Sequence, residues 1–150
     1  MILLTDIKSS INQQLKNKFH YKIYGREIKD DFDRPCFFVE LLPSGSDAET
    51  QNFTSNKLTV IITYFQVLQQ DKGYSDLENI KMFDSLKELF KLNLPVGSRT
   101  LHPQNIRSAY TGDNLDILQT SFDLDYFDGT GRQRNTEEPA SSVNVNLKEV

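Results

Sequence analysis

Residues 53–69 read FTSNKLTVIITYFQVLQ and contain the longest strand that the sequence predicts. Apolar side chains recur there at every second position, which is the period of a strand whose side chains point alternately to its two faces. One face carries Leu58, Val60, Ile62 and Tyr64. The stretch is also rich in Thr, Val, Ile, Tyr and Phe, the residue types that favour strands.

Two further stretches predict strands of different kinds. Residues 36–42 form an apolar run between Pro35 and Pro43, which we interpret as a central strand buried on both faces. Residues 118–126 alternate apolar with polar side chains, which predicts a strand with one buried and one solvated face. Shorter strands are expected at 21–25, 99–102 and 106–110, with a turn at 112–114.

Two helices are expected. Ile7, Ile11 and Leu15 recur at steps of four, which predicts an amphipathic helix capped by Thr5 or Asp6. The second helix starts at a predicted capping box, in which Ser75 serves the first free amides and Glu78 reaches back. It ends before Pro95, and its expected apolar stripe is Leu77, Ile80, Phe83, Leu86 and Phe90.

The order of these elements defines a fold class. A helix, three strands, a second helix and two or three further strands predict an α+β domain, with one mainly antiparallel sheet of five to six strands packed by two helices. A doubly wound nucleotide-binding fold would need a regular alternation of strands and helices, which is missing here. The expected core is Phe37, Val39, Leu41, Val60, Ile62, Phe83 and Phe122. Residues 1–128 form the expected domain, and residues 129–150 a flexible C-terminal tail.

Two polar stretches are candidates for contacts with other proteins. Residues 43–51, which carry Asp47 and Glu49, are predicted to be a loop and could form an assembly surface. The alternative is a solvated hairpin loop without a partner.

The second candidate lies in the tail, where Val143, Val145 and Leu147 would share one face of a short strand. Such a strand could pair with the sheet edge of a neighbouring subunit or of a neck protein. The alternative is that these residues have no fixed structure in the free monomer.

Composition excludes several classes of protein. Seventeen basic and 21 acidic residues give a formal charge of −4 without an evident basic cluster, so we expect no sequence-specific binding of nucleic acid. The single cysteine excludes an intramolecular disulfide and a cysteine-rich zinc site. Apolar runs are much shorter than the ~20 residues of a membrane-spanning helix, so we expect no membrane segment and assembly inside a cell.

No residue pattern indicates an enzyme, a metal site or another cofactor. A calcium loop starting at Asp123 would place Phe127 at position five and Arg134 at position twelve, where oxygen ligands are required. The acidic group Asp30, Asp31 and Asp33, followed by Glu40, resembles nuclease strands but lacks their lysine. The sequence shows no base or carboxylate partner for Cys36, His20 or His102.

One family resemblance remains. Residues 22–29 (KIYGREIK) and 32–40 (FDRPCFFVE), together with both helices and the long strand, resemble the tail terminator family of tailed phages, prophages and phage-tail-like bacteriocins. The resemblance covers about residues 1–127. These motifs consist of strand and turn residues and contain no catalytic signature.

The resemblance implies a structural subunit of a phage tail or tail-like particle, assembled in the bacterial cytoplasm. Its expected partners are further copies of itself in a ring, usually of six, the tail tube protein, and a neck or head-completion protein. Such a ring caps the tube and stops its polymerisation. Two alternatives stay open: another head-tail joining or neck protein, and a small intracellular enzyme or ligand-binding domain.

Overall fold

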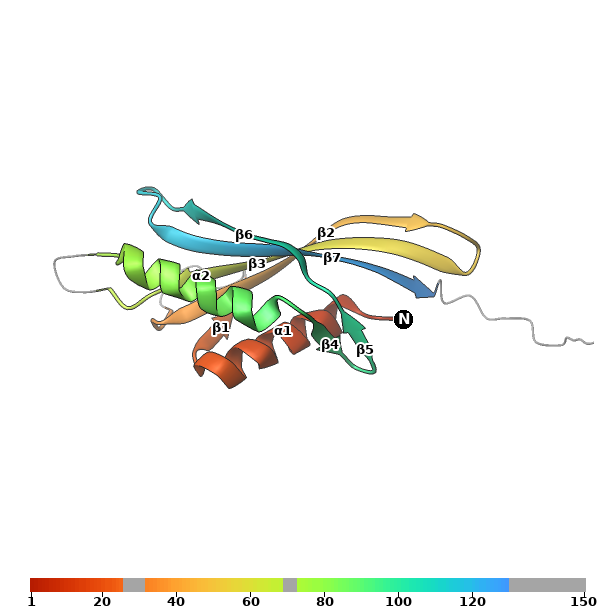
Figure 1. Ribbon diagram of the computed structural model, residues 1–150, viewed down its shortest axis with the longest axis horizontal. Coiled ribbons are helices and arrows are strands. Elements are labelled where there is room, and N and C mark those ends of the chain that lie inside the picture. Colours follow the sequence, from red (N-terminus) through yellow and green to blue (C-terminus); the bar gives the residue numbers. More distant parts are fainter. Residues whose placement is uncertain (26–31, 69–72, 130–150) are drawn as a thin grey trace, which may run out of the picture.

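The computed structural model describes residues 1–25, 32–68 and 73–129 of the 150-residue chain. Their order is α1 (Leu4–Phe19), β1 (Lys22–Tyr24), β2 (Cys36–Ala48), β3 (Phe53–Phe65), α2 (Asp76–Phe90), β4 (Leu94–Val96), β5 (Arg99–Leu101), β6 (Gln104–Thr111) and β7 (Ile117–Gly129). Five strands form one sheet in the order β1-β2-β3-β7-β6, and β4 pairs with β5 in a separate hairpin (Figure 1). The predicted α+β class is confirmed.

The centre of the sheet is β3, which pairs with β2 on one side and β7 on the other along nearly its whole length. Both neighbours are antiparallel to it, while the short β1 runs parallel to β2. Residues 36–42, predicted as a central strand, form an interior strand at Cys36–Phe38, where β2 pairs with both β1 and β3, but the centre of the sheet is β3. The burial of β2 is one-sided after Phe38, since Leu42 is 55% exposed.

One face of the sheet and the two helices enclose the core. Phe37, Val39, Val60, Ile62 and Phe122 are fully buried as predicted. They pack with residues of both helices, Ile7, Ile11, Leu15, Leu86 and Phe90. Leu41 and Phe83 were expected in this core but are only partly buried at its margin.

The buried face of α2 differs from the predicted stripe. Leu77 and Ile80 are 58% and 48% exposed, whereas Asn79, Met82, Leu86 and Phe90 face inward. The cause is a buried polar contact at the start of the helix. The side-chain amide of Gln66 donates to Asn79 Oδ1 at 2.9 Å, and the side-chain amide of Asn79 donates to the backbone carbonyl of Asp116 at 3.0 Å. These hydrogen bonds set the rotation of the helix, and counting apolar residues could not predict it.

The helix caps agree with the predictions only in part. The Ser75 hydroxyl oxygen caps α2 by accepting a hydrogen bond from the backbone N–H of Glu78. The backbone N–H of Ser75 donates to Gln66 Oε1 at 2.8 Å, so it does not need the Glu78 side chain that the predicted capping box assigned to it. In α1 the predicted caps, Thr5 and Asp6, lie inside the helix, which begins at Leu4 without a side-chain cap. Asp6 lies in the first turn, where its charge suits the helix dipole.

The β4–β5 hairpin was predicted only in its second half. Pro95 suggested a break, yet proline is tolerated in a two-stranded edge pair. Gly97, at φ +60°, turns the chain between the strands. Leu94, Val96 and Leu101 are buried, so the hairpin closes one side of the core beside α1.

Strands β2, β3 and β7 are much longer than the helices. Thirteen residues of β2, β3 or β7 span about 43 Å, whereas the sixteen residues of α1 span about 24 Å. One end of the three-stranded unit therefore runs past the helices (Figure 1). We call residues 43–57 and 124–129 the arm. None of the helices that the structure describes is long and apolar enough to span a membrane.

The core assignment can be tested by truncation. We expect Phe37→Ala and Phe122→Ala each to lower the free energy of unfolding by about 3–5 kcal/mol, because each ring is fully buried. Phe127→Ala is the matched control: this ring is 60% exposed on the arm, so the change should stay within about 0.5 kcal/mol. Urea unfolding followed by circular dichroism measures all three. Equal losses at the three positions would contradict the assignment.

Candidate assembly surface

The arm has two faces, which the strand register identifies. The inner face continues the core face and carries Pro43, Ser46, Asn56, Leu58 and Tyr126. The outer face carries Asp47, Ser55 and Phe127 in one row across the three strands. The helices do not reach along the arm, but residues 1–5 and Arg99 lie against its inner face, so the outer face is the more exposed of the two.

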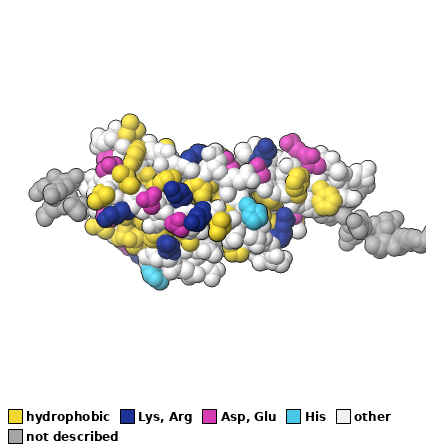
Figure 2. All heavy atoms as spheres, viewed as in Figure 1, with side chains coloured by type: hydrophobic (Ala, Val, Ile, Leu, Met, Phe, Trp, Pro, Cys, Tyr) yellow, Lys and Arg dark blue, Asp and Glu magenta, His cyan; other side chains and the backbone are white. Residues whose placement is uncertain are grey.

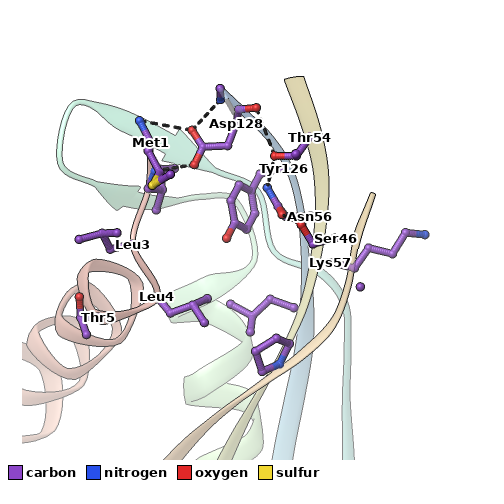
Figure 3. Close-up of a pocket in the computed structure, with 15 residues that line it drawn as sticks. Met1, Leu3, Leu4, Thr5, Ser46, Thr54, Asn56, Lys57, Tyr126 and Asp128 are labelled. Carbon is purple, nitrogen blue, oxygen red and sulfur yellow. Dashed lines mark hydrogen bonds and ion pairs between the residues drawn. The ribbon is translucent and has the colours of Figure 1, made fainter. Parts of the chain in front are cut away.

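A groove of about 710 Å³ lies on the inner face, between the arm and residues 1–5. Leu3, Leu4, Leu58 and Tyr126 make part of its lining apolar (Figure 3). Towards the tip the lining becomes polar. Ser46 Oγ donates to Asn56 Oδ1 at 2.7 Å, and the side-chain amide of Asn56 donates to Thr54 Oγ1 at 3.3 Å. The groove therefore offers an apolar half near the helices and a polar half near the tip.

Asp128 holds the N-terminal segment against the arm. Its carboxylate is only 7% exposed and accepts a hydrogen bond from the Ile2 amide at 2.7 Å (Figure 3). The Met1 amino group lies 3.4 Å away, and Arg99 of β5 donates to the same carboxylate at 3.3 Å. Arg99 also donates to the Phe127 carbonyl at 2.7 Å. One aspartate thus connects β7, the N-terminal segment and the β4–β5 hairpin.

The outer face mixes apolar and charged side chains. Leu42, Phe53 and Phe127 are each more than half exposed. Asp123 lies four residues before Phe127 in β7. Burial opposes the ionisation of its carboxyl group, but hydrogen bonds from Thr59, Arg107 and Asn105 outweigh burial and lower its pKa. Hydrophobic and acidic side chains also lie next to each other over the right-hand end in Figure 2, where Figure 1 places the arm.

The predicted loop at 43–51 is largely a strand. Residues 43–48 continue β2 and pair with residues 54–58, so only the stretch around Glu49 turns the chain. Ser, Gly and Asp favour turns, which is why the sequence predicted a loop, but pairing with β3 overrides that preference. Asp47 is exposed on the outer face opposite Ser55, and the Glu49 amide donates to the Phe53 carbonyl at 3.0 Å. Both candidates therefore lie at the tip of the arm.

The other predicted assembly residues, Val143, Val145 and Leu147, lie outside the described residues, as does the tail from residue 130. Gly129, which we had assigned to that tail, is the last residue of β7.

Sequence reasoning missed Asp128 and Arg99. A signal for Asp128 was present, because it falls on the apolar face of β7, in step with Leu118, Phe122 and Tyr126. A carboxylate at such a position requires a partner.

The residues tested for chemistry do not come together. Cys36 is fully buried, and burial raises the pKa of its thiol to about 11, so it is not an activated nucleophile. His20 ends α1 and His102 lies beside the Leu92 carbonyl, both exposed. Asp33 pairs with Lys22, while Asp30 and Asp31 lie outside the described residues. Within residues 1–25, 32–68 and 73–129, no three His, Cys, Asp or Glu side chains form a group that could hold a metal ion.

A family model described as phage tail terminator protein matches residues 6–138. The chain belongs to the phage tail terminator family. This match confirms the resemblance stated from the sequence. Terminators are structural components of phage tails rather than enzymes. No curated protein matches the sequence.

The fold itself recurs among solved structures. One of them, which bears only a sequence identifier as its name, has a TM-score of 0.52 and 13% sequence identity. The match covers 89% of this terminator and 100% of the solved chain. At this identity the likeness concerns the fold alone.

The contacts of Asp128 predict its effect on stability. We expect Asp128→Ala to lower the free energy of unfolding by about 1–3 kcal/mol, because the Ile2 amide and the Arg99 guanidinium both lose an acceptor. Asp125→Ala, at an exposed position on the other face of β7, should change it by less than about 0.5 kcal/mol. Thermal or urea unfolding of both variants measures the difference. No difference between the two would show that the contacts of Asp128 do not stabilise the fold.

Proposed function

We propose that the protein forms a ring of six subunits on the end of the finished tail tube, stops tube polymerisation and provides the docking surface for the neck or head. The arm supplies contacts between subunits and with the tube. Membership of the terminator family supports the proposal, and so does the shape of the subunit. Assembly takes place in the bacterial cytoplasm, before or during joining to the head.

The arm is the observation that carries this proposal. Three paired strands extend beyond the helices that cover the rest of the sheet, and the arm exposes Phe53 and Phe127, whose positions lie two residues apart along the outer face. Large exposed apolar side chains gathered in one region mark contact sites on soluble proteins. Packing against a neighbouring subunit or the tube would cover them, whereas a solitary domain gains nothing from the extension.

Charge at the tip suits contacts that must be specific. Asp47 and Glu49 add two negative charges to an apolar surface, and charged groups at an interface select the partner and its orientation more than they raise affinity. We infer that they orient the tip against a neighbouring subunit or the tube. A head-tail joining or neck protein is the other structural alternative, and the family match favours the terminator.

Charge reversal at the tip tests the proposed role. We expect Asp47→Lys with Glu49→Lys to leave folding intact, because both residues lie at the exposed tip, and to impair capping. Without a cap, tubes should vary widely in length. Electron microscopy of particles from a producing strain, in which the variant replaces the native protein, gives the distribution of tube lengths.

A matched control is Asp84→Lys with Asp113→Lys, which reverses two exposed charges on α2 and on the β6–β7 turn. Tubes of normal length are expected with this control. If tubes are uniform with the tip variant, the arm tip does not contribute to termination. If uniform tubes also form in the absence of the protein, the proposed function is wrong.

A further inference from the structure

Within residues 1–25, 32–68 and 73–129, no strand pairs with the free edge of β2 along the arm. Of the strands that the structure describes, β1 pairs only with Cys36–Phe38, and β3 occupies the other side of β2. From Leu41 to Ala48, therefore, no described strand lies on the outer edge of β2. An edge strand with unpaired backbone groups can accept a further strand.

The usable part of this edge is short. Pro43 has no backbone N–H to donate, and the register shifts between Pro43 and Gly45. Both features interrupt pairing and protect an edge from unspecific association. Residues 45–48 follow the interruption as a regular, mostly exposed stretch, and together with Ser44 they give an edge long enough for a strand of about five residues.

The surroundings of this edge specify what an added strand would look like. Side chains on its inner face would enter the groove beside Leu3, Leu4 and Pro43. Those on its outer face would extend the exposed row that contains Asp47. A fitting strand therefore has apolar side chains at alternate positions and polar side chains between them.

The sequence contains a stretch with this alternation outside the described residues. Residues 143–147 read VNVNL, so an extended conformation would put Val143, Val145 and Leu147 on one side and the two asparagines on the other. The described chain leaves the domain at Gly129, at the same end of the arm as Ala48. Residues 130–142 can span up to about 45 Å when extended, which is enough to reach an adjacent molecule.

We propose that residues 143–147 of one subunit pair with residues 44–48 of β2 in the next subunit, with Val143, Val145 and Leu147 in its groove. At Gly129, β7 runs outward along the arm (Figure 1), so a chain continuing in that direction moves away from its own β2 edge. Reaching its own edge would require a full reversal around the β2–β3 turn. This inference rests on the proposed ring, which places neighbouring arms side by side.

Cysteine cross-linking of assembled particles tests the proposal. The native thiol, Cys36, is fully buried and does not compete. Two single variants, Gly45→Cys and Asn144→Cys, place both thiols on the outer face; they are mixed, assembled on tubes and treated with a short thiol cross-linker. We expect a cross-linked dimer containing one of each, and the double variant should give a ladder of covalent oligomers. Asn144→Cys mixed with Asp113→Cys, at the opposite end of the sheet, should give none.

A second pair of variants tests the orientation of the strand. Val145→Asp with Leu147→Asp would place charges in the groove, and the yield of cross-links should fall by about tenfold or more. Asn144→Asp with Asn146→Asp adds the same charge on the outward side and should leave the yield close to that of the native sequence. Because Asn144 is substituted in the control, the tail cysteine is introduced as Ser142→Cys in both of these experiments.

The outcomes separate this inference from the proposed function. Particles with tubes of normal length but no cross-link overturn the pairing and leave the terminator function intact. A double variant that gives only an internal cross-link also overturns it, since the segment then covers its own edge. If the protein is absent from tubes of normal length, both the function and the pairing are wrong.

Discussion

The difference in length between strands and helices governs this structure. Strands β2, β3 and β7 are held together by continuous antiparallel pairing over a length that the helices cover only in part. Where helices cover the sheet, alternate side chains form a closed core containing Phe37, Ile62 and Phe122. Beyond them the same pairing continues, and of the described residues only the N-terminal segment and Arg99 lie against the inner face of the arm. The backbone of the arm is therefore stabilised by hydrogen bonds within the subunit, while much of its apolar surface remains available for contacts between molecules.

An uncovered arm would be of little use for assembly if it moved freely, and a few polar contacts hold its base. Asp128 joins β7 to the N-terminal segment and, through Arg99, to the β4–β5 hairpin. The buried Gln66–Asn79 pair fixes α2 in the same manner at the opposite end of the domain. These are structural uses of charge and amide groups, and the described part of the chain brings no acid, base and nucleophile together. The proposed function depends on the shape of the subunit and on its contact surfaces, as expected for a family of structural proteins.

The sequence predicted the features that follow from periodicity and failed where a tertiary contact decides. Alternation identified β3 and β7 with their buried faces, because only side-chain spacing was needed. It did not identify residues 44–48 as a strand, because Ser, Gly and Asp favour turns unless a partner strand pairs with them. The stripe of Leu77 and Ile80 on α2 was predicted from hydrophobicity, but the Asn79 hydrogen bonds turn the helix away from it. Asp47 and Glu49 are exposed, and their role in assembly stays a prediction; their position at the tip of a three-stranded arm depends on pairing between distant segments.

The central claim is that the arm, rather than the helical side, is the surface through which the subunit assembles. Amide hydrogen exchange, measured on the full-length protein free in solution and bound to tail tubes, tests this most directly. The account predicts that binding slows exchange in residues 41–57 and 124–129, while amides on the exposed side of α2 exchange at similar rates in both states. Protection confined to α2, with unchanged exchange in the arm, would contradict it.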